Sequence, residues 1–447
     1  MTPISDSAST DVLNVSNEPS TSLSSSSASQ DTPAGSSTQR DLPPILSFNR
    51  QFLRGRKGHR WSTEPRSSIV GRSAAHNIMT SCTPGPSFSC EEILALIGIL
   101  LLSGVNKDNH AATEEMFKPT MGIPAYRSGL SERRFCFLLR CIGFDDRATR
   151  DERQKEDPFA AVSQVFIDNC KHRYYPGENI TIDEQLLAFR GRCGFRMYIP
   201  NKPAKYGLKF MLICDFKSRY MLNAMPYLGK KTKPPDAVAL GHYVAMELCK
   251  LCFGSKRNIT GDNWFTSVSL VKKLLEKGLT YVGTIRKNKE EIREEMTDKT
   301  RFKPRQCAFL FDDNTTLLTR CCPNKSSKKL VTLLSSMHRH PDIHEKGKLE
   351  IIMYYNKTKR GVGIFDQSCS NNSCNRMTKR WPMAIFYGMV NAAGVNASIL
   401  YHSHIVNQGK KAQTRRRFMK ALALEMIRPW AETRIAQPQF HWASEKL

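Results

Sequence analysis

Two aspartates stand at the ends of predicted strands and could together bind a divalent metal ion. Asp183 lies in NITIDEQ, and Asp262 lies in NITGDNWFTS. Because open α/β sheets place their ligands outside the carboxyl ends of their strands, both carboxylates could converge on one site. Carboxylate oxygens suit Mg²⁺, and two such ions can stabilise the attacking and leaving oxygens of a phosphodiester displacement. Spacing alone leaves a second interpretation open, in which both aspartates are turn or N-cap residues.

A segment rich in cations and aromatic residues follows the first aspartate. Residues 189–209 (FRGRCGFRMYIPNKPAKYGLK) interleave these cations with Phe189, Tyr198 and Tyr206. The cations are Arg190, Arg192, Arg196, Lys202, Lys205 and Lys209. Cations contact phosphates and aromatic rings stack on bases or sugars, so the pattern favours DNA contact over a merely solvated edge strand.

The cysteines and histidines form no metal-binding pattern. Cys249 and Cys252 make a C-x-x-C, but no second pair follows at zinc-finger spacing. Both lie in the apolar stretch AMELCKLCF, which predicts a helix with buried, reduced thiols. We therefore predict no structural zinc and assign no histidine to catalysis.

The composition indicates a polyanionic partner. Lys and Arg number 67 against 41 Asp and Glu, which gives a net charge of +26 in 447 residues. Such an excess points to nucleic acid before a membrane surface. The longest apolar run, residues 93–102 (ILALIGILLL), is shorter than the roughly 20 residues of a membrane span, and no secretory leader opens the chain. We expect a soluble intracellular protein that binds neither a membrane nor a small-molecule substrate.

The chain changes character along its length. Residues 1–45 hold 18 Ser or Thr and a net charge of −4, which predicts a disordered tail. Helical patterns then dominate up to residue 175, with Ser89 and Glu92 framing a capping box. The expected regions are the tail 1–45, a helical N-terminal region 46–175, a core in two parts 176–289 and 348–400, an insertion 290–347 and a basic helical segment 401–447.

The expected elements of the core combine strands with helices. The predicted strands are 178–186, 207–215, 220–229, 257–262, 280–288 and 348–356 (KLEIIMYYN), the second and third forming a hairpin. The predicted helices of this part are 242–253, 269–278 and 380–403. These lengths indicate an α/β core built on a mixed sheet that contains a hairpin.

Six sequence blocks resemble the piggyBac-type DNA transposases. They are TIDEQLLAFRGRCGFRMYIPNKPAKYGLKF, MPYLGK, NITGDNWFTS, YVGTIRKNKEEI, MYYNKTKRGVGIFDQ and RWPMAIFYGM, in the family's order. The resemblance spans about residues 90–428 and implies an RNase H-like mixed-sheet core with an insertion, flanked by helical dimerisation and DNA-binding regions. It also implies cut-and-paste chemistry at TTAA sites with three catalytic aspartates and Mg²⁺ or Mn²⁺.

One of the three catalytic positions is not an aspartate. By resemblance Asp183 is the first and Asp262 the second, but the third falls on Gly363 in RGVGIFDQ. The retained Asp366 is displaced about 4.5 Å along a helix axis, whereas site geometry tolerates about 0.5 Å. Asp366 is therefore only a possible partial substitute as a metal ligand. Glu184 is nearer in sequence, but adjacent side chains of a strand point to opposite faces.

Three functions remain open. The preferred hypothesis is a nuclear, homodimeric protein that binds double-stranded DNA but is impaired in cleavage and strand transfer. The family's C-terminal cysteine-rich domain is also expected to be missing, because no Cys follows Cys374. The alternatives are an active transposase that uses Asp366 and a non-enzymatic interaction scaffold. By resemblance, Arg286 and Lys289 lie near the DNA backbone, and the basic runs RGRKGHR and KKAQTRRRFMK are either nuclear import signals or DNA-facing patches.

Overall fold

The computed structural model describes residues 52–54, 60–62, 88–144, 160–229, 232, 234, 238–322, 329–343 and 348–436. The predicted tail, residues 1–45, and most of the first basic run lie outside these ranges. The chain divides into two compact units, residues 1–68 and 69–447. In the first unit, strands β1 (Phe52–Arg54) and β2 (Arg60–Ser62) pair antiparallel. All other described elements belong to the second unit.

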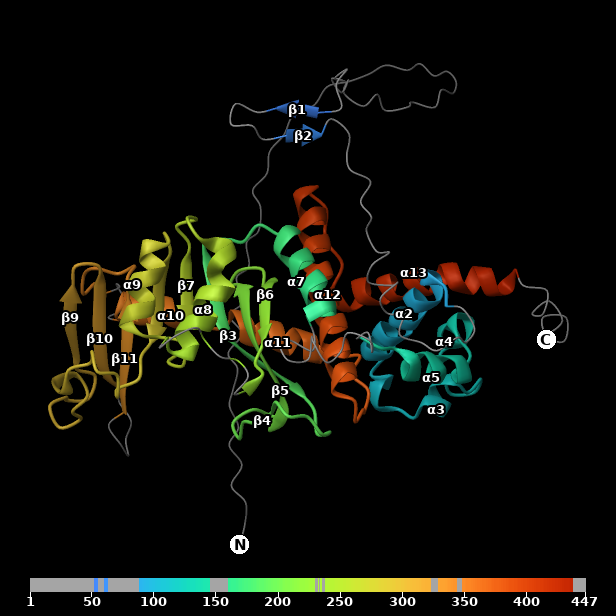
Figure 1. The fold of residues 1–447 in the computed structure, drawn as a ribbon, viewed down its shortest axis with the longest axis horizontal. Coiled ribbons are helices and arrows are strands. Elements are labelled where there is room, and N and C mark those ends of the chain that lie inside the picture. Colours follow the sequence, from blue (N-terminus) through green and yellow to red (C-terminus); the bar gives the residue numbers. More distant parts are fainter. Residues whose placement is uncertain are drawn as a thin grey trace, which may run out of the picture. The chain divides into compact units, whose positions relative to one another are not determined.

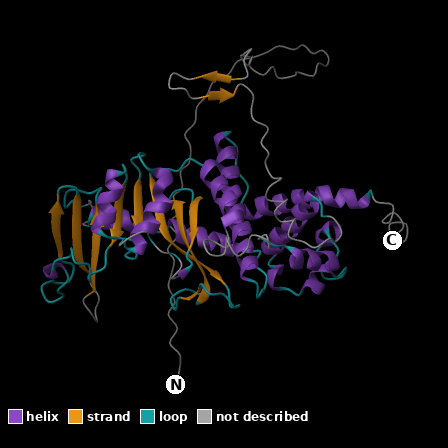
Figure 2. Cartoon of the chain, in the orientation of Figure 1, coloured by secondary structure: helices purple, strands orange, loops and turns teal. Residues whose placement is uncertain are grey.

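Within the described residues, a nine-stranded mixed sheet forms the centre of the second unit (Figures 1 and 2). Its strands are β3 (Asn179–Ala188), β4 (Arg196–Tyr198), β5 (Tyr206–Asp215), β6 (Met221–Pro226), β7 (Asn258–Gly261), β8 (Thr280–Thr284), β9 (Cys307–Asp312), β10 (Thr315–Cys322) and β11 (Lys329–Ser335). The order is β4-β5-β3-β7-β8-β11-β10-β9, with β6 paired to β5. Strands β3, β7 and β8 run parallel to one another, and all other pairs are antiparallel.

The helices cover the sheet and extend beyond it. They are α2 (Cys90–Asn106), α3 (Thr113–Phe117), α4 (Pro124–Gly129), α5 (Glu132–Cys141), α7 (Ala160–His172), α8 (Leu240–Cys249), α9 (Val268–Glu276), α10 (Glu350–Thr358), α11 (Gly361–Asn371), α12 (Trp381–Asn407) and α13 (Arg415–Ile435). The described residues also include the short 3₁₀ helices η1 (Asp108–His110), η3 (Lys250–Cys252) and η4 (Glu294–Met296). Figure 1 shows α8 and α9 in front of the sheet and α11 behind it.

The central strands are buried on both faces, and their side chains alternate between two helical layers. On one face, the Thr181 hydroxyl donates to the Thr358 carbonyl of α10 at 2.6 Å. A side chain at Gly361 would collide with Thr181, so this glycine lets α11 approach β3 closely. On the other face, Ile182 packs in a core that also contains Leu248 of α8. The predicted α/β fold with a mixed, hairpin-containing sheet is confirmed.

Helices from the two ends of the second unit share a separate hydrophobic core. Residues of α2, such as Leu96 and Ile99, pack with Ala423 and Ile427 of α13, and all four are at most 3% exposed. The predicted capping box at α2 is half confirmed: the Ser89 hydroxyl accepts from the Glu92 amide at 3.1 Å. The Glu92 carboxylate instead pairs with Arg134 of α5.

One predicted strand is wrong. Residues 348–356 were expected to be extended, but Glu350–Thr358 forms helix α10. The run EIIMYY is short and rich in apolar residues, so its periodicity cannot distinguish a strand from a buried helix. Ile351 packs instead among β8, β10 and β11. The segment expected to be an insertion, 290–347, contributes β9, β10 and β11, which continue the central sheet from β8.

Helix α12 is long and apolar enough to cross a membrane by length and composition, but 72% of its most apolar window is buried inside the fold. Val395 and Ile399 pack in the core of the sheet, while Phe386 and Tyr387 pack among the helices around α2. Burial within the protein therefore accounts for its apolar composition. Cys249 and Cys252 are buried as predicted, with at most 1% of each exposed.

Candidate metal centre

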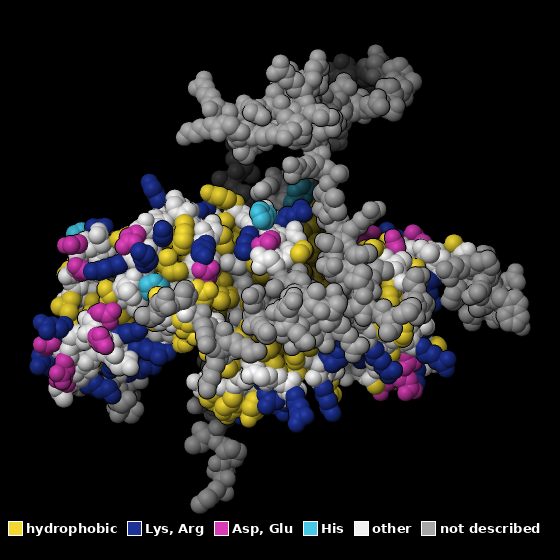
Figure 3. Space-filling model, viewed as in Figure 1, with side chains coloured by type: hydrophobic (Ala, Val, Ile, Leu, Met, Phe, Trp, Pro, Cys, Tyr) yellow, Lys and Arg dark blue, Asp and Glu magenta, His cyan; other side chains and the backbone are white. Residues whose placement is uncertain are grey.

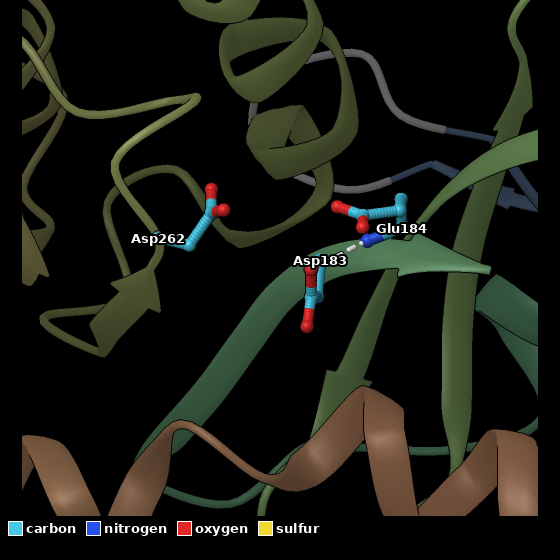
Figure 4. A group of neighbouring side chains, drawn as sticks. All are labelled: Asp183, Glu184 and Asp262. Atoms are coloured by element: carbon cyan, nitrogen blue, oxygen red, sulfur yellow. Dashed lines mark hydrogen bonds between the residues drawn. The ribbon is translucent and has the colours of Figure 1, made fainter. Parts of the chain in front are cut away.

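The neighbouring parallel strands β3 and β7 bring Asp183 and Asp262 close together, on the side of the sheet where β7 ends. The two strands pair in register from Asn179 opposite Asn258 to Thr181 opposite Thr260. Asp183 therefore lies two residues beyond the last pair on β3, and Asp262 directly follows the end of β7. Their carboxylates lie close together (Figure 4), although Asp183 lies within β3, which continues to Ala188, and not at a strand end as predicted.

Glu184 joins these two aspartates, which the strand alternation did not lead us to expect. One carboxylate oxygen from each of Asp183, Glu184 and Asp262 lies within 4.8 Å of the other two. The Glu184 amide donates to Asp183 Oδ1 at 2.8 Å, and the Glu184 side chain turns toward Asp262 (Figure 4). Adjacent Cβ atoms of a strand point to opposite faces, but the longer glutamate side chain brings its carboxylate back toward the two aspartates. The expectation that Glu184 points away from the site is therefore wrong.

Burial and mutual repulsion make the charged forms of the two aspartates costly. Burial, reinforced by the neighbouring Glu184 carboxylate, raises the pKa of Asp183 well above its ordinary value. Burial also raises the pKa of Asp262, although the Trp264 amide, which donates to Asp262 Oδ1 at 2.9 Å, opposes the shift. Neutralisation by a bound cation would relieve this repulsion.

Two lysines of the predicted DNA-binding segment face the carboxylates. Lys202 Nζ lies 3.3 Å from Glu184 Oε1. Lys209 Nζ lies 4.9 Å from the ring centroid of Trp264 and 5.7 Å from that of Tyr227. Burial lowers the pKa of Lys209, whereas the three carboxylates raise it. No spacing signal links Lys209 to Trp264, because the contact depends on the pairing of strands far apart in sequence.

The loop after Asp262 is fixed by hydrogen bonds and packing. The Thr266 hydroxyl lies 2.7 Å from the Asp262 carbonyl oxygen and 2.8 Å from the Tyr281 hydroxyl. Phe265 is 2% exposed and meets the Trp264 ring edge to face at 4.7 Å between centroids. The aromatic pair therefore packs the start of α9 against the sheet, which also fixes the backbone that carries Asp262.

Helix α11 presents neither Gly363 nor Asp366 as a third ligand. Gly363 is exposed in the first turn, and a Cβ built on it would have no neighbouring atom within 4 Å. Asp366 is not part of the carboxylate cluster, and its Oδ1 accepts a hydrogen bond from Gln185 Nε2 at 2.8 Å. Among the described residues, the carboxylates grouped closely enough for one metal ion are Asp183, Glu184 and Asp262.

The remaining cations of the segment lie on the surface around β4 and β5. Arg190, Arg192, Arg196 and Lys205 are exposed. Arg196 stacks over Tyr206 at 5.4 Å, and Tyr206 lies 4.8 Å from Tyr198, ring to ring. Figure 3 shows Lys and Arg side chains beside hydrophobic ones at this end of the sheet.

Three other predicted contact residues differ in their exposure. Phe189 is 3% exposed, so it packs in the core rather than offering a stacking surface. Arg286 is exposed just beyond β8, and Lys289 is half-buried. The exposed cations and tyrosines of residues 190–206 thus form the accessible part of the predicted DNA-binding segment.

Comparison with known proteins decides the family. A family model described as Transposase IS4 matches residues 72–398. A solved piggyBac transposase, in a synaptic complex with hairpin DNA, superposes with a TM-score of 0.75 at 42% sequence identity. That alignment covers 82% of this chain and 78% of the transposase. The chain belongs to the piggyBac transposase family.

Human members of the piggyBac family are more distant. PiggyBac transposable element-derived protein 2 is 23% identical over 336 residues, which cover 70% of this chain and 55% of that protein. PiggyBac transposable element-derived protein 3 is 21% identical over 228 residues, covering 49% of this chain and 38% of that protein. The chain therefore spans about half or less of these relatives.

The donor set in this piggyBac-family chain fits a hard divalent cation. All three grouped side chains offer carboxylate oxygens, which Mg²⁺ and Mn²⁺ prefer, and none offers nitrogen or sulfur. Burial is the first cause of the raised pKa values of Asp183 and Asp262, and a bound cation would favour their ionised forms. Asp183, Glu184 and Asp262 are the residues that would hold the ion.

Proposed function

We propose that this chain is a nuclear DNA-binding protein with a piggyBac transposase fold, impaired in DNA cleavage and strand transfer. The exposed cations and tyrosines of residues 190–206 lie on and around β4 and the start of β5, which pairs with the strand β3 that carries Asp183 and Glu184. They suit a phosphate backbone with stacked bases. The 42%-identical piggyBac transposase was solved with hairpin DNA. DNA would thus meet the surface that carries Asp183 and Asp262.

The observation that carries the impairment is the open space around Gly363. A side chain there would meet no atom within 4 Å, so the fold has room for a carboxylate that the chain lacks. Asp366 is engaged by Gln185 rather than by the metal centre. A bound Mg²⁺ or Mn²⁺ would polarise the scissile phosphodiester and lower the pKa of an attacking water. Asp183 and Asp262 would position that ion, but without help from helix α11.

The grouping of Glu184 with Asp183 and Asp262 favours residual cleavage as a second candidate function. Three carboxylates remain available if Glu184 ligates the metal ion. Its salt bridge with Lys202, at 3.3 Å, competes with that role. Strand cleavage without completed transfer is the activity that this arrangement would support.

The experiment is a hairpin-and-excision assay on TTAA-flanked DNA with Mg²⁺, comparing the wild type with Gly363→Asp. We expect activity only in Gly363→Asp, because the open position accepts the carboxylate. Gly363→Asn is the matched control, since it has the same shape without the charge, and DNA binding is measured for each form. Excision by the wild type would refute the impairment, and loss of DNA binding in all forms would favour the scaffold alternative.

A homodimer is the proposed assembly, because two DNA ends must be held together for any transfer. The run KKAQTRRRFMK supports nuclear import, and its cations Lys410, Lys411, Arg416 and Arg417 are exposed before and at the start of α13. Sedimentation of the purified chain with and without DNA tests the dimer. Localisation of a tagged chain with these four cations replaced by Gln tests the import signal.

A further inference from the structure

Lys209 holds a positive charge beside the metal centre, on the strand next to Glu184. Strand β5 pairs with β3 so that Lys209 lies opposite Leu186, two residues beyond Glu184. Its side chain is half-buried, and all three carboxylates interact favourably with its charge, Glu184 most strongly. The ammonium is therefore part of the electrostatics of the centre rather than of the outer DNA-facing surface.

Two aromatic rings keep this ammonium in place independently of the carboxylates. Lys209 Nζ lies 4.9 Å from the Trp264 ring centroid and 5.7 Å from the Tyr227 ring centroid, within the range of cation–π attraction. The Trp264 amide also donates to Asp262 Oδ1, so one residue orients both a metal-binding carboxylate and the lysine. A cation anchored in this way is a fixed feature of the site.

The charge balance limits how many dications the site can hold. When all three carboxylates are ionised, as metal ligands would be, they and the ammonium groups of Lys202 and Lys209 carry a net charge of −1. One Mg²⁺ would bring the total to +1, whereas two would bring it to +3 in a partly buried space. Gly363 supplies no further carboxylate to offset a second ion. The repulsion from Lys209 would act directly on that second ion, because the low local dielectric screens it poorly.

We propose that this chain has a one-metal centre in which the Lys209 ammonium takes the electrostatic place of a second metal ion. The single dication is held by Asp183, Glu184 and Asp262. Lys209 then provides the other positive charge facing a bound phosphate, and the Trp264 and Tyr227 rings position it. This inference deepens the proposed function and rests on its metal centre, but not on its loss of activity.

The test is the number of Mn²⁺ ions bound by the full-length chain without DNA, measured by calorimetry and electron paramagnetic resonance. We expect one ion in the wild type, with no spin-coupled pair. Lys209→Gln should bind a second ion, or bind the first about tenfold more tightly. Lys209→Arg should restore the wild-type behaviour, because it keeps the charge. Lys287→Gln, which removes the same charge from an exposed site beyond β8, should change neither quantity.

Two coupled Mn²⁺ ions in the wild type would overturn the proposal, and so would Lys209→Gln with unchanged stoichiometry and affinity. A wild type that binds no Mn²⁺ would overturn it as well, while leaving DNA binding intact as a function. The number of Mn²⁺ ions bound by the wild type is measured without any variant. If Lys209→Gln misfolds, that number alone still decides whether the proposal holds. Excision by a wild type that binds one ion would refute the proposed impairment but support the one-metal centre.

Discussion

Three carboxylates crowd into one partly buried site, and in the absence of metal this crowding opposes folding. The effect is largest for Asp183, because burial and the adjacent Glu184 carboxylate both raise its pKa. A raised pKa in the folded state means that the folded chain prefers the protonated acid, whereas the unfolded chain ionises near pH 4. Stability that is present at low pH is therefore lost as pH rises through the raised pKa of Asp183.

This crowding gives a pH-dependent prediction for Asp183→Asn. In chelator-treated protein, the variant should melt above the wild type, with a difference that grows from pH 6 to pH 9 to roughly 2–4 °C. The amide cannot ionise, so it avoids the cost that the wild type acquires. Scanning calorimetry at several pH values measures the difference. Asp366→Asn, which lies outside the cluster and can keep its contact with Gln185, should show no such trend, and a flat difference for Asp183→Asn would contradict the argument.

The sequence predicted that Asp183 and Asp262 would lie close together, and they do. Asp262 directly follows a short buried strand, a position that is encoded locally, whereas Asp183 lies within β3, which continues to Ala188, and comes close to Asp262 because β7 ends beside it. Glu184 was misassigned because alternation describes Cβ directions and not where the end of a long side chain lies. Lys209 was expected to face DNA, and its contact with Trp264 depends on β5 and the loop after β7 meeting in space. Local sequence patterns do not indicate which strands and loops lie next to one another in the fold.

At the scale of elements, a buried ion pair joins α2 to α5. Arg134 donates to both Glu92 carboxylate oxygens, from Nε at 2.6 Å and from a terminal nitrogen at 2.7 Å. The Glu92 side chain is 2% exposed, whereas that of Arg134 is 26% exposed. The pair joins the two helices, and removal of Arg134 would take both of these hydrogen bonds from the buried Glu92 carboxylate.

Breaking this pair from one side should destabilise the helical core. Arg134→Met should lower the free energy of unfolding by about 3 kcal/mol, because the buried Glu92 carboxylate would lose its bidentate partner. The double variant Glu92→Gln/Arg134→Met should lose less than Arg134→Met alone. Denaturant unfolding measures both values. Arg428→Met, which breaks an exposed pair with Glu425, is the control expected to change little, and an equal loss there would refute the explanation.

Elements with a clear period or a capping signal were the ones that the sequence located well. Helix α2 begins after Ser89 as its cap predicts, and the hairpin of β5 and β6 falls where two apolar runs flank a short turn. Residues 348–356 were misassigned because Ile, Met and Tyr at successive positions suit a strand and a buried helix equally. Tertiary contacts with β8, β10 and β11 then decide for α10.

At the scale of the whole molecule, the charge of +26 and its exposed arginines predict DNA binding that weakens steeply with salt. Arg192→Gln should weaken binding to different DNA sequences by similar factors. It should also reduce the slope of log affinity against log salt by about 1, as for one lost phosphate contact. Fluorescence anisotropy at several salt concentrations provides the slopes. Lys277→Gln, an exposed charge at the end of α9, is the matched control, and equal slopes in all three proteins would exclude Arg192 from the interface.

The packing of α2 against α13 has a consequence for how the protein is made. On the ribosome, α2 with its run Ile93, Leu96, Ile99 and Leu100 is made more than 300 residues before its partner residues Ala423 and Ile427. The nascent chain therefore exposes an apolar helix face until α13 has been translated. Such a surface is a binding site for chaperones and a starting point for aggregation. Yield should thus depend on chaperone supply during translation more than on the stability of the finished fold.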